Sequence, residues 1–286
     1  MNITITAATG HLGRLVIDEL LSRGVPAANI VAAVRTPAKA ADLAARGIQV
    51  READYDRPET LRTALAGTDR LLFISGSEAG SRFAQHRNVV DAAAAVAVPS
   101  VAYTSILKAD TSGVSLAVEH KATEELLAAS GIATTLLRNG WYLENYTENL
   151  APTLEHGALV GAAGDGLVSA ASRADYAAAA AAVLTGDGHE GKVYELGGDT
   201  AFTLSDLAAA ITDVTGTPVT YTDLPAAQLV RVLSVAGLPE PVAQMLASAD
   251  EGIARGDLHT TTGDLSRLIG RPTTTVIDAL RLAVKG

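Results

Sequence analysis

The N-terminal stretch from Ile3 to Ile17 constrains the fold more than any other part of this sequence. Ile3 and Ile5 alternate with threonines, which is typical of a strand. From Leu12 onward apolar residues recur at helical spacing, and Gly24 marks the expected end of the helix. A strand that turns through small residues into a helix leaves unpaired N–H groups at the positive end of the helix dipole. The stretch therefore predicts a dinucleotide-binding turn.

The small residues of this turn are spaced Ala7-x-x-Gly10-x-x-Gly13, whereas the general dinucleotide fingerprint is G-x-G-x-x-G. The spacing alone also fits a tight strand-to-helix turn that binds nothing. Its place at the start of the chain, followed by alternating strand-like and helix-like segments, favours the cofactor interpretation.

That alternation predicts an α/β fold, a Rossmann-type doubly wound parallel sheet with a smaller, mostly helical C-terminal substrate lobe. Further strands are expected at 29–35, 48–52, 70–75, 101–106 and 134–138, with helices between them. We expect residues 1–150 to form the dinucleotide-binding domain, with segments of 158–200 partly returning to it. Residues 201–286 should be mainly the substrate-binding lobe.

Several motifs together indicate a family. They are the Thr-x-x-Thr-Gly-x-Leu-Gly run that ends at Gly13, Ala102-Tyr103-Thr104-Ser105, Leu137-Arg138-Asn139-Gly140-Trp141-Tyr142 and Gly161-Ala162-Ala163-Gly164-Asp165-Gly166. Over nearly the whole chain the sequence resembles the NmrA-like branch of the atypical short-chain dehydrogenase/reductases, and within it the NADPH:quinone oxidoreductases and triphenylmethane reductases. Those relatives usually have glycine where Ala7 stands, so a methyl group is added where the chain passes close to the cofactor.

The end of the expected strand at 29–35 bears on the choice of cofactor. NAD-specific sites place a carboxylate there for the ribose 2′-hydroxyl, but this strand ends in Arg35, with Lys39 one helical turn later. Two cations and no carboxylate suit a 2′-phosphate, although Arg35 also fits an ordinary solvated side chain. We therefore expect NADPH and its oxidised form NADP rather than NADH.

Other expected cofactor contacts lie where strands end, because ligands of open α/β sheets bind at the carboxyl ends of strands. Ser75 to Ser77 would flank the ribose and phosphates, although these residues are also good turn formers. The resemblance implies that Asp54 and Tyr55 lie against the adenine, and that Asn139 to Tyr142 border the nicotinamide and the acceptor. The full expected cofactor set is Ala7, Thr9, Gly10, His11, Leu12, Gly13, Arg35, Lys39, Asp54, Tyr55, Ser75, Gly76, Ser77, Thr104, Asn139, Gly140, Trp141 and Arg173.

The expected catalytic residues are His120, Asn139 and Tyr142. Most short-chain dehydrogenases pair a Tyr with a Lys four residues later, but Ala117 stands four residues before Lys121, so that pair is absent. A quinone or conjugated dye spreads the arriving charge over its own π-system, and solvent completes the protonation. His120 is a substitute acid, unless it forms a solvated pair with Glu124 on the helix surface.

Asn139 would hydrogen-bond a carbonyl, and Trp141 and Tyr142 would stack, although Trp141 also fits a packing role between the lobes. Arg173 starts its helix near the expected crevice, where it could contact the cofactor. An exposed arginine in the capping region of the helix, without contact to the cofactor, fits the sequence equally well. No metal site is expected at His86, because no second histidine lies three or four residues away. His86 is expected to be mainly structural, although its helix begins beside the crevice.

The amino-acid composition and net charge exclude several classes of function. The chain of 286 residues has no cysteine and a formal net charge of −10, so we expect neither thiolate metal sites nor binding to nucleic acid. No apolar run approaches the roughly 20 residues that cross a membrane, and the first strand begins too early for a signal peptide. We expect a cytoplasmic monomer or homodimer that acts on a small molecule.

The leading hypothesis is an NADPH-dependent reductase that transfers hydride to quinones or related conjugated electrophiles without metal or flavin. The alternative is an NmrA-like redox sensor that binds NADP(H) with little or no turnover, which the missing Tyr acid also fits. An ordinary alcohol dehydrogenase or sugar epimerase would require that Tyr.

Overall fold

The computed structural model describes residues 1–78 and 80–285 and divides the chain into two compact units. The first unit comprises Met1–Ile106, Glu119–Arg138 and Arg173–Tyr194, and the second comprises Leu107–Val118, Asn139–Ser172 and Glu195–Gly286. This division places residues 139–150 in the second unit, whereas the first domain was expected to extend to residue 150. That the second unit binds the substrate remains a prediction.

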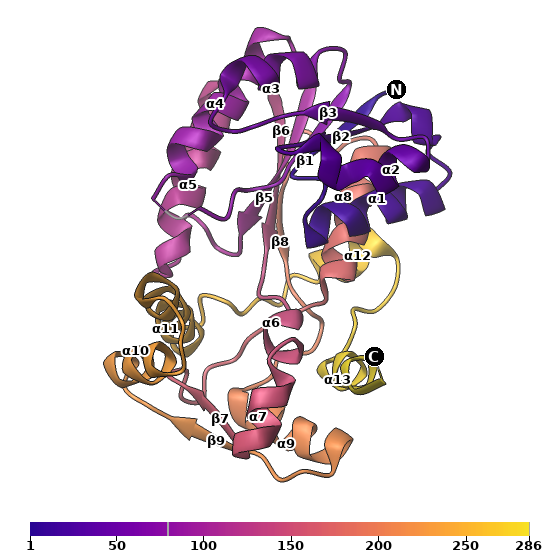
Figure 1. The fold of residues 1–286 in the computed structure, drawn as a ribbon. Coiled ribbons are helices and arrows are strands. Elements are labelled where there is room, and N and C mark those ends of the chain that lie inside the picture. The colour runs from indigo at the N-terminus through magenta and orange to yellow at the C-terminus, as the bar shows by residue number, and fades with distance from the viewer. Residues whose placement is uncertain (79, 286) are drawn as a thin grey trace. The chain divides into compact units, whose positions relative to one another are not determined.

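A seven-stranded sheet in the order β3-β2-β1-β4-β5-β6-β8 organises the first unit (Figure 1). The strands are β1 (Ile3–Thr6), β2 (Ile30–Val34), β3 (Gln49–Glu52), β4 (Arg70–Phe73), β5 (Ser100–Ile106), β6 (Ala133–Asn139) and β8 (Val193–Leu196). Strand β1 pairs in parallel with β2 on one side and β4 on the other, with Ile3 opposite Ile30 and Arg70. The chain reverses its winding direction at β1, which confirms the predicted doubly wound sheet.

Helices cover both faces of this sheet. Helices α1 (His11–Ser22), α2 (Ala41–Ala45) and α8 (Arg173–Thr185) lie on one face, and α3 (Pro58–Leu65), α4 (Arg82–Ala95) and α5 (Ser115–Ala129) on the other (Figure 1). Short 3₁₀ turns at Ala27–Asn29 and Pro37–Ala40 flank β2. Every residue of β1 and β2 is buried, as expected for strands enclosed by helices on both sides.

Local sequence explains where these helices start and stop. Pro58 occupies the first turn of α3, where its missing N–H leaves no bond unmade. Gly24, Gly67 and Gly131 follow α1, α3 and α5 with φ angles of +82°, +74° and +75°, a left-handed conformation that glycine adopts without strain. The helix end expected at Gly24 is confirmed, and Gly67 and Gly131 end their helices in the same way.

The second unit consists of one short parallel strand pair and several helices. Strand β7 (Ala158–Gly161) pairs with β9 (Thr220–Asp223). Its helices are α6 (Glu144–Thr147), α7 (Leu150–His156), α9 (Leu204–Thr215), α10 (Ala226–Val235), α11 (Glu240–Arg255), α12 (Asp264–Ile269) and α13 (Val276–Lys285). Thr203 caps α9 in a capping box with Asp206. The sequence over 142–156 is compatible with a single helix, whereas the structure has two short helices there, α6 and α7, separated at residues 148–149.

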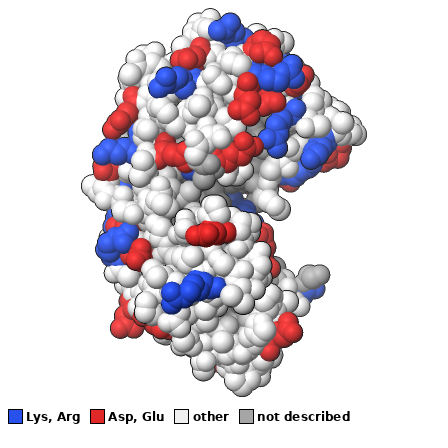
Figure 2. Space-filling model, turned by 60° about the vertical axis from the view of Figure 1, so that its left-hand side comes forward, with Lys and Arg blue, Asp and Glu red and all other residues white. Residues whose placement is uncertain are grey.

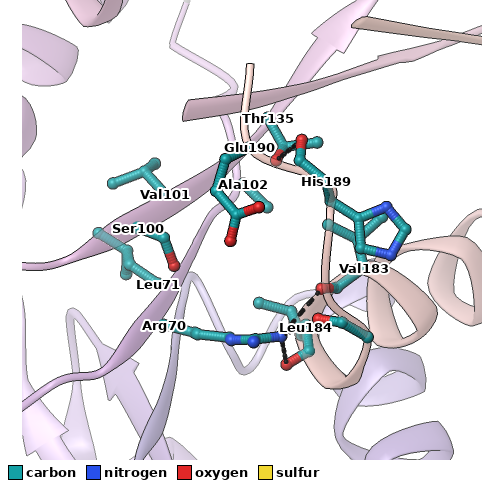
Figure 3. Close-up of a pocket in the computed structure, with 11 residues that line it drawn as sticks. Arg70, Leu71, Ser100, Val101, Ala102, Thr135, Val183, Leu184, His189 and Glu190 are labelled. Carbon is teal, nitrogen blue, oxygen red and sulfur yellow. Dashed lines mark hydrogen bonds between the residues drawn. The ribbon is translucent and has the colours of Figure 1, made fainter. Parts of the chain in front are cut away.

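At the amino ends of β4 and β5, Arg70 caps the last turn of α8. Its guanidinium donates to the carbonyl oxygens of Leu184, at 3.1 Å, and of Gly186 (Figure 3). It also forms an ion pair with Asp187. These carbonyls have no partner within the helix. The cavity beside them, of about 20 Å³, has room for little more than one water molecule. The contacts of Arg70 therefore stabilise the end of α8, and the cavity beside it is too small for a cofactor.

Figure 2 shows basic and acidic side chains interspersed on the face that it displays. Within residues 1–78 and 80–285, no helix combines the length and apolar character needed to cross a membrane.

Candidate cofactor site

A pocket of about 450 Å³ opens at the carboxyl ends of β1, β2, β3 and β4 in the first unit. Its volume is in the range of small-molecule sites. Thirteen predicted cofactor residues line it: Ala7, Thr9, Gly10, His11, Leu12, Gly13, Arg35, Lys39, Asp54, Tyr55, Ser75, Gly76 and Ser77. Sequence positions from 7 to 77 thus converge on one cavity, at the place where open α/β sheets bind ligands.

The turn between β1 and α1 presents backbone donors to this pocket. Gly10 is the N-cap of α1, no side chain caps the helix, and its first turn contains no acidic residue. The N–H groups of His11, Leu12 and Gly13 consequently have no intrahelical acceptor, and they lie at the positive end of the helix dipole. This end of the helix fits a diphosphate.

Gly13 allows α1 to pack directly against the end of β1. A Cβ atom at this position would lie 2.8 Å from the carbonyl oxygen of Ala7 and 2.8 Å from the Cα of Ala8. Both are backbone atoms, so neither can move away as a flexible side chain would. The close approach of helix and strand therefore requires glycine here.

Ala7 has a φ angle of +48°, in the left-handed region that residues with a Cβ rarely adopt. Its carbonyl accepts the N–H of Gly10 at 2.9 Å, which closes the turn. Alanine at this position therefore strains the backbone itself, in addition to the bulk that its methyl group adds beside the cofactor.

Replacing Ala7 by Gly is expected to raise the free energy of unfolding by about 0.5 kcal/mol, because relief of the left-handed strain exceeds the greater entropy of an unfolded glycine. The matched control is Ala8→Gly. Ala8 is fully buried and has no positive φ, so its replacement should lower stability by about 1 kcal/mol. Urea denaturation of both variants measures the two effects, and a loss of stability in Ala7→Gly would contradict the strain.

Arg35 follows β2 and reaches the pocket with an exposed guanidinium. It forms an ion pair of 2.9 Å with Glu78, and the side-chain exposures are 67% and 48%. Gln85 also donates to Glu78, at 2.9 Å, and these two hydrogen bonds lower the pKa of the Glu78 carboxyl. The cation expected at a 2′-phosphate is thus held by an anion on the loop after β4. Lys39 lies one turn further on in the same lining.

Asp54 and Tyr55 enter the pocket from the segment after β3. The Tyr55 hydroxyl is 2.6 Å from Thr6 Oγ1 and donates to the carbonyl of Ile74 at 2.8 Å. Burial raises the pKa of this phenol far above its usual value, so it stays protonated. Tyr55 therefore ties the ends of β1, β3 and β4 together at the cavity wall.

Thr104 does not line the pocket but supports it, since its hydroxyl accepts the N–H of Ser75 at 2.9 Å. Arg173 is the first residue of α8 and is likewise outside the described lining. Both were predicted as direct cofactor contacts.

His120 is buried on α5, and its Nδ1 lies 2.8 Å from the hydroxyl of Tyr103. Burial and the nearby charge of Arg82 lower its pKa to about 3, so the imidazole is neutral at physiological pH. The alternative of a solvated surface pair with Glu124 is wrong, because both side chains are buried. Glu124 is itself buried, and it accepts hydrogen bonds from Arg138 at 2.6 Å and from Ser105 at 2.5 Å.

Asn139, Gly140, Trp141 and Tyr142 belong to the second unit, which is described by itself. Asn139 ends β6 with 6% of its surface exposed, and its Oδ1 atom is buried without a hydrogen-bond partner among the described residues. Trp141 and Tyr142 are half-buried. A buried acceptor without a donor is costly, so Asn139 is suited to a ligand N–H.

Sequence reasoning missed six residues of the pocket lining: Thr36, Ala53, Asp56, Ile74, Glu78 and Gln85. Glu78 had the best available signal, because it directly follows the Ser75–Ser77 segment at the end of a predicted strand. Gln85 had none, because its contacts with Asp56 and Glu78 arise only when α4 packs beside the loop after β3.

The second unit contains a carboxyl group with a raised pKa. Asp250 of α11 accepts the N–H of Ala162 at 2.8 Å, and burial together with the charge of Asp223 raises its pKa from 3.8 to about 6. Because the folded state holds this proton more tightly than the unfolded state, the contribution of Asp250 to stability falls as the pH rises from about 4 to about 6.

Asp250→Asn is expected to remove this pH dependence. An amide oxygen can still accept the Ala162 N–H, so the variant should be more stable than the parent by about 2 kcal/mol at pH 7 and no more stable at pH 4. Denaturation at several pH values tests this. A stability difference that stays constant between pH 4 and pH 7 would show that Asp250 does not titrate as described.

Comparisons with known proteins agree with this geometry. A family model described as NAD(P)H-binding matches residues 7–187. Quinone oxidoreductase 2 of Escherichia coli is 54% identical over 97% of both chains. The crystal structure of the Escherichia coli NADPH-dependent quinone oxidoreductase QOR2 complexed with NADPH is 54% identical, covers 99% of both chains and superposes with a TM-score of 0.96.

The Citrobacter triphenylmethane reductase complexed with NADP(H) is 40% identical, covers 99% of this chain and 100% of its own, and has a TM-score of 0.95. The family model spans well over half of the chain, and the relatives match it along its whole length. The chain therefore belongs to the NAD(P)H-binding family that the model describes.

Proposed function

We propose that this protein is an NADPH-dependent quinone oxidoreductase, a reductase for quinones or related conjugated acceptors. The single observation that carries the proposal is the pocket at the carboxyl ends of β1 to β4, which combines open helix amides with Arg35 and Lys39. A full-length relative at 54% identity is named a quinone oxidoreductase, and its crystal structure is described as a complex with NADPH.

The pocket residues divide between the parts of the dinucleotide. The first-turn N–H groups of α1 bind the diphosphate, and Arg35 and Lys39 bind the 2′-phosphate. Asp54 and Tyr55 lie against the adenine, and Ser75 to Ser77 flank the ribose. Glu78 has to release Arg35 before the phosphate can take its place.

Bound NADPH supplies the hydride, and together with one proton from solvent this reduces a quinone to the hydroquinone and leaves NADP. The protein contributes proximity and orientation. Asn139 offers its buried Oδ1 to a ligand N–H, and Tyr142 stacks on the acceptor. The neutral, buried His120 is poorly suited to act as the acid, so His120→Ala should leave quinone turnover within about threefold of the parent. We further propose that the protein is cytoplasmic and is a monomer or a homodimer.

The experiment mixes the full-length protein with NADPH and a small benzoquinone and follows the absorbance of the reduced cofactor. Consumption well above the uncatalysed rate supports the reductase. Saturable binding of NADPH without consumption, for a range of quinones and triphenylmethane dyes, would favour the redox sensor instead.

A further inference from the structure

Residues 74–78, which directly follow β4, form one wall of the cofactor pocket, and two buried side chains hold this segment at Gly76. The N–H of Gly76 donates to Nε2 of His86 at 2.9 Å, and its carbonyl oxygen accepts from Nε of Arg82 at 2.7 Å. His86 is 0% exposed and Arg82 is 5% exposed. Both side chains come from α4, one helical turn apart.

The Gly76 contact determines which nitrogen of His86 carries the proton. A backbone N–H can only donate, so Nε2 must accept, and the neutral ring then carries its proton on Nδ1. Nδ1 lies 2.8 Å from Thr123 Oγ1, and the Thr123 hydroxyl donates to the carbonyl of Glu119 at 2.8 Å. The donors and acceptors thus form one consistent chain from the pocket wall to α5.

The residues around His86 keep its imidazole neutral, with the proton on Nδ1. Its ring meets Phe73 edge-on at 4.8 Å between centroids and Tyr103 at 5.7 Å. Burial and the positive charge of Arg82 lower the pKa of His86 to about 3. Arg82 is anchored in turn by Glu119 at 3.1 Å. A protonated imidazole would place an N–H against the Gly76 N–H and break the contact.

We propose that His86 is a positioning residue for the cofactor, which fixes the Gly76 peptide and so sets the pocket wall at Ser75 to Ser77, with Arg82 holding the other side of the same residue. The proposal rests on the proposed function, because it assigns that wall to NADPH. It gives a role at the site to a histidine that touches neither the pocket nor the reacting atoms.

Two substitutions of His86 distinguish a role in positioning Gly76 from a role in core packing alone. In His86→Gln the amide oxygen can reach the place of Nε2 and accept the Gly76 N–H, whereas the Thr123 contact is lost. In His86→Asn the shorter amide can reach only the place of Nδ1, so it retains Thr123 and loses Gly76. Each variant thus keeps one of the two short hydrogen bonds of the parent imidazole, to Gly76 or to Thr123, and loses the other.

Titration of the full-length protein with NADPH is the primary test. We expect His86→Asn to weaken NADPH binding about 10-fold, and His86→Gln to bind within about threefold of the parent. At saturating NADPH, kcat and the KM for the quinone should remain within about twofold in both variants, because the reacting groups are unchanged.

Amide hydrogen exchange of Gly76 gives a second readout that needs no cofactor. Protection should persist in His86→Gln and fall at least about 10-fold in His86→Asn, while the amides of β1 stay protected in both. Equal NADPH affinity in the two variants, or a weaker Gln variant, would overturn the proposal. Failure of the parent protein to bind NADPH would instead remove the proposed function.

Discussion

Replacing Arg35 by Asp is expected to weaken NADPH binding about 100-fold, or about 2.7 kcal/mol, and to leave NADH binding within about threefold. The substitution removes a cation from the pocket lining and places an anion where the 2′-phosphate would lie. NADH has a hydroxyl at that position and loses no ion pair. Isothermal titration with both nucleotides measures the two affinities.

Glu78→Gln is the matched control for this prediction. Glu78 holds Arg35 at 2.9 Å and competes with a phosphate for it. Removal of its charge should therefore strengthen NADPH binding about threefold, since an exposed ion pair is worth only about 0.2–1 kcal/mol. Equal losses of NADPH and NADH affinity in Arg35→Asp, or no loss at all, would show that Arg35 does not bind the 2′-phosphate.

Gly13→Ala is expected to lower the free energy of unfolding by about 3 kcal/mol and to abolish measurable NADPH binding at micromolar protein. Within a helix, glycine to alanine ordinarily stabilises by about 1 kcal/mol, so the sign of the effect is diagnostic. Here the new methyl group would lie 2.8 Å from two backbone atoms of Ala7 and Ala8. Helix α1 must shift away from β1, and its N–H groups then leave their positions.

Gly10→Ala serves as the control, because its Cβ would meet only the carbonyl oxygen of Ala7, at 3.2 Å. We expect a stability loss of at most about 1 kcal/mol there, the ordinary cost of alanine at an N-cap. Thermal and urea denaturation of both variants measure the two changes in the free energy of unfolding. A Gly13→Ala protein as stable as the parent would show that the contact between α1 and β1 is looser than described.

The sequence predicted most of the first unit because its strands and helices carry local signals. Buried strands appear as short apolar runs, and glycine or proline marks the helix ends, as at Pro58 and Gly131. Residues 142–156 carried one such signal, Pro152, which lies in the first turn of α7 directly after the break. This proline was not used as a helix-start signal, so the break between α6 and α7 was missed.

At the site, residues that follow a strand directly were predictable, because the carboxyl ends of parallel strands converge. Arg35 and Ser75 belong to this class. Glu78 was missed because its pairing with Arg35 joins positions 43 residues apart. His86 was interpreted only as a structural histidine, since its contact with Gly76 depends on the packing of α4 against the end of β4.

The strain at Ala7 and the burial of His120 were also beyond sequence reasoning. A positive φ at alanine cannot be inferred from residue identity, because it arises from closure of the turn between β1 and α1. Helical spacing placed His120 and Glu124 on one face of α5, but it did not show that this face is buried.

The central claim is that the first unit binds NADPH, with the diphosphate on the amides of α1 and the 2′-phosphate on Arg35. Calorimetric titration of the unmodified protein with NADPH and, separately, with NADH tests it most directly. We predict saturable binding of one NADPH per chain and binding of NADH at least about 10-fold weaker, because NADH lacks the phosphate that Arg35 and Lys39 would hold. Equal affinities, or no saturable heat with either nucleotide on folded protein, would contradict it.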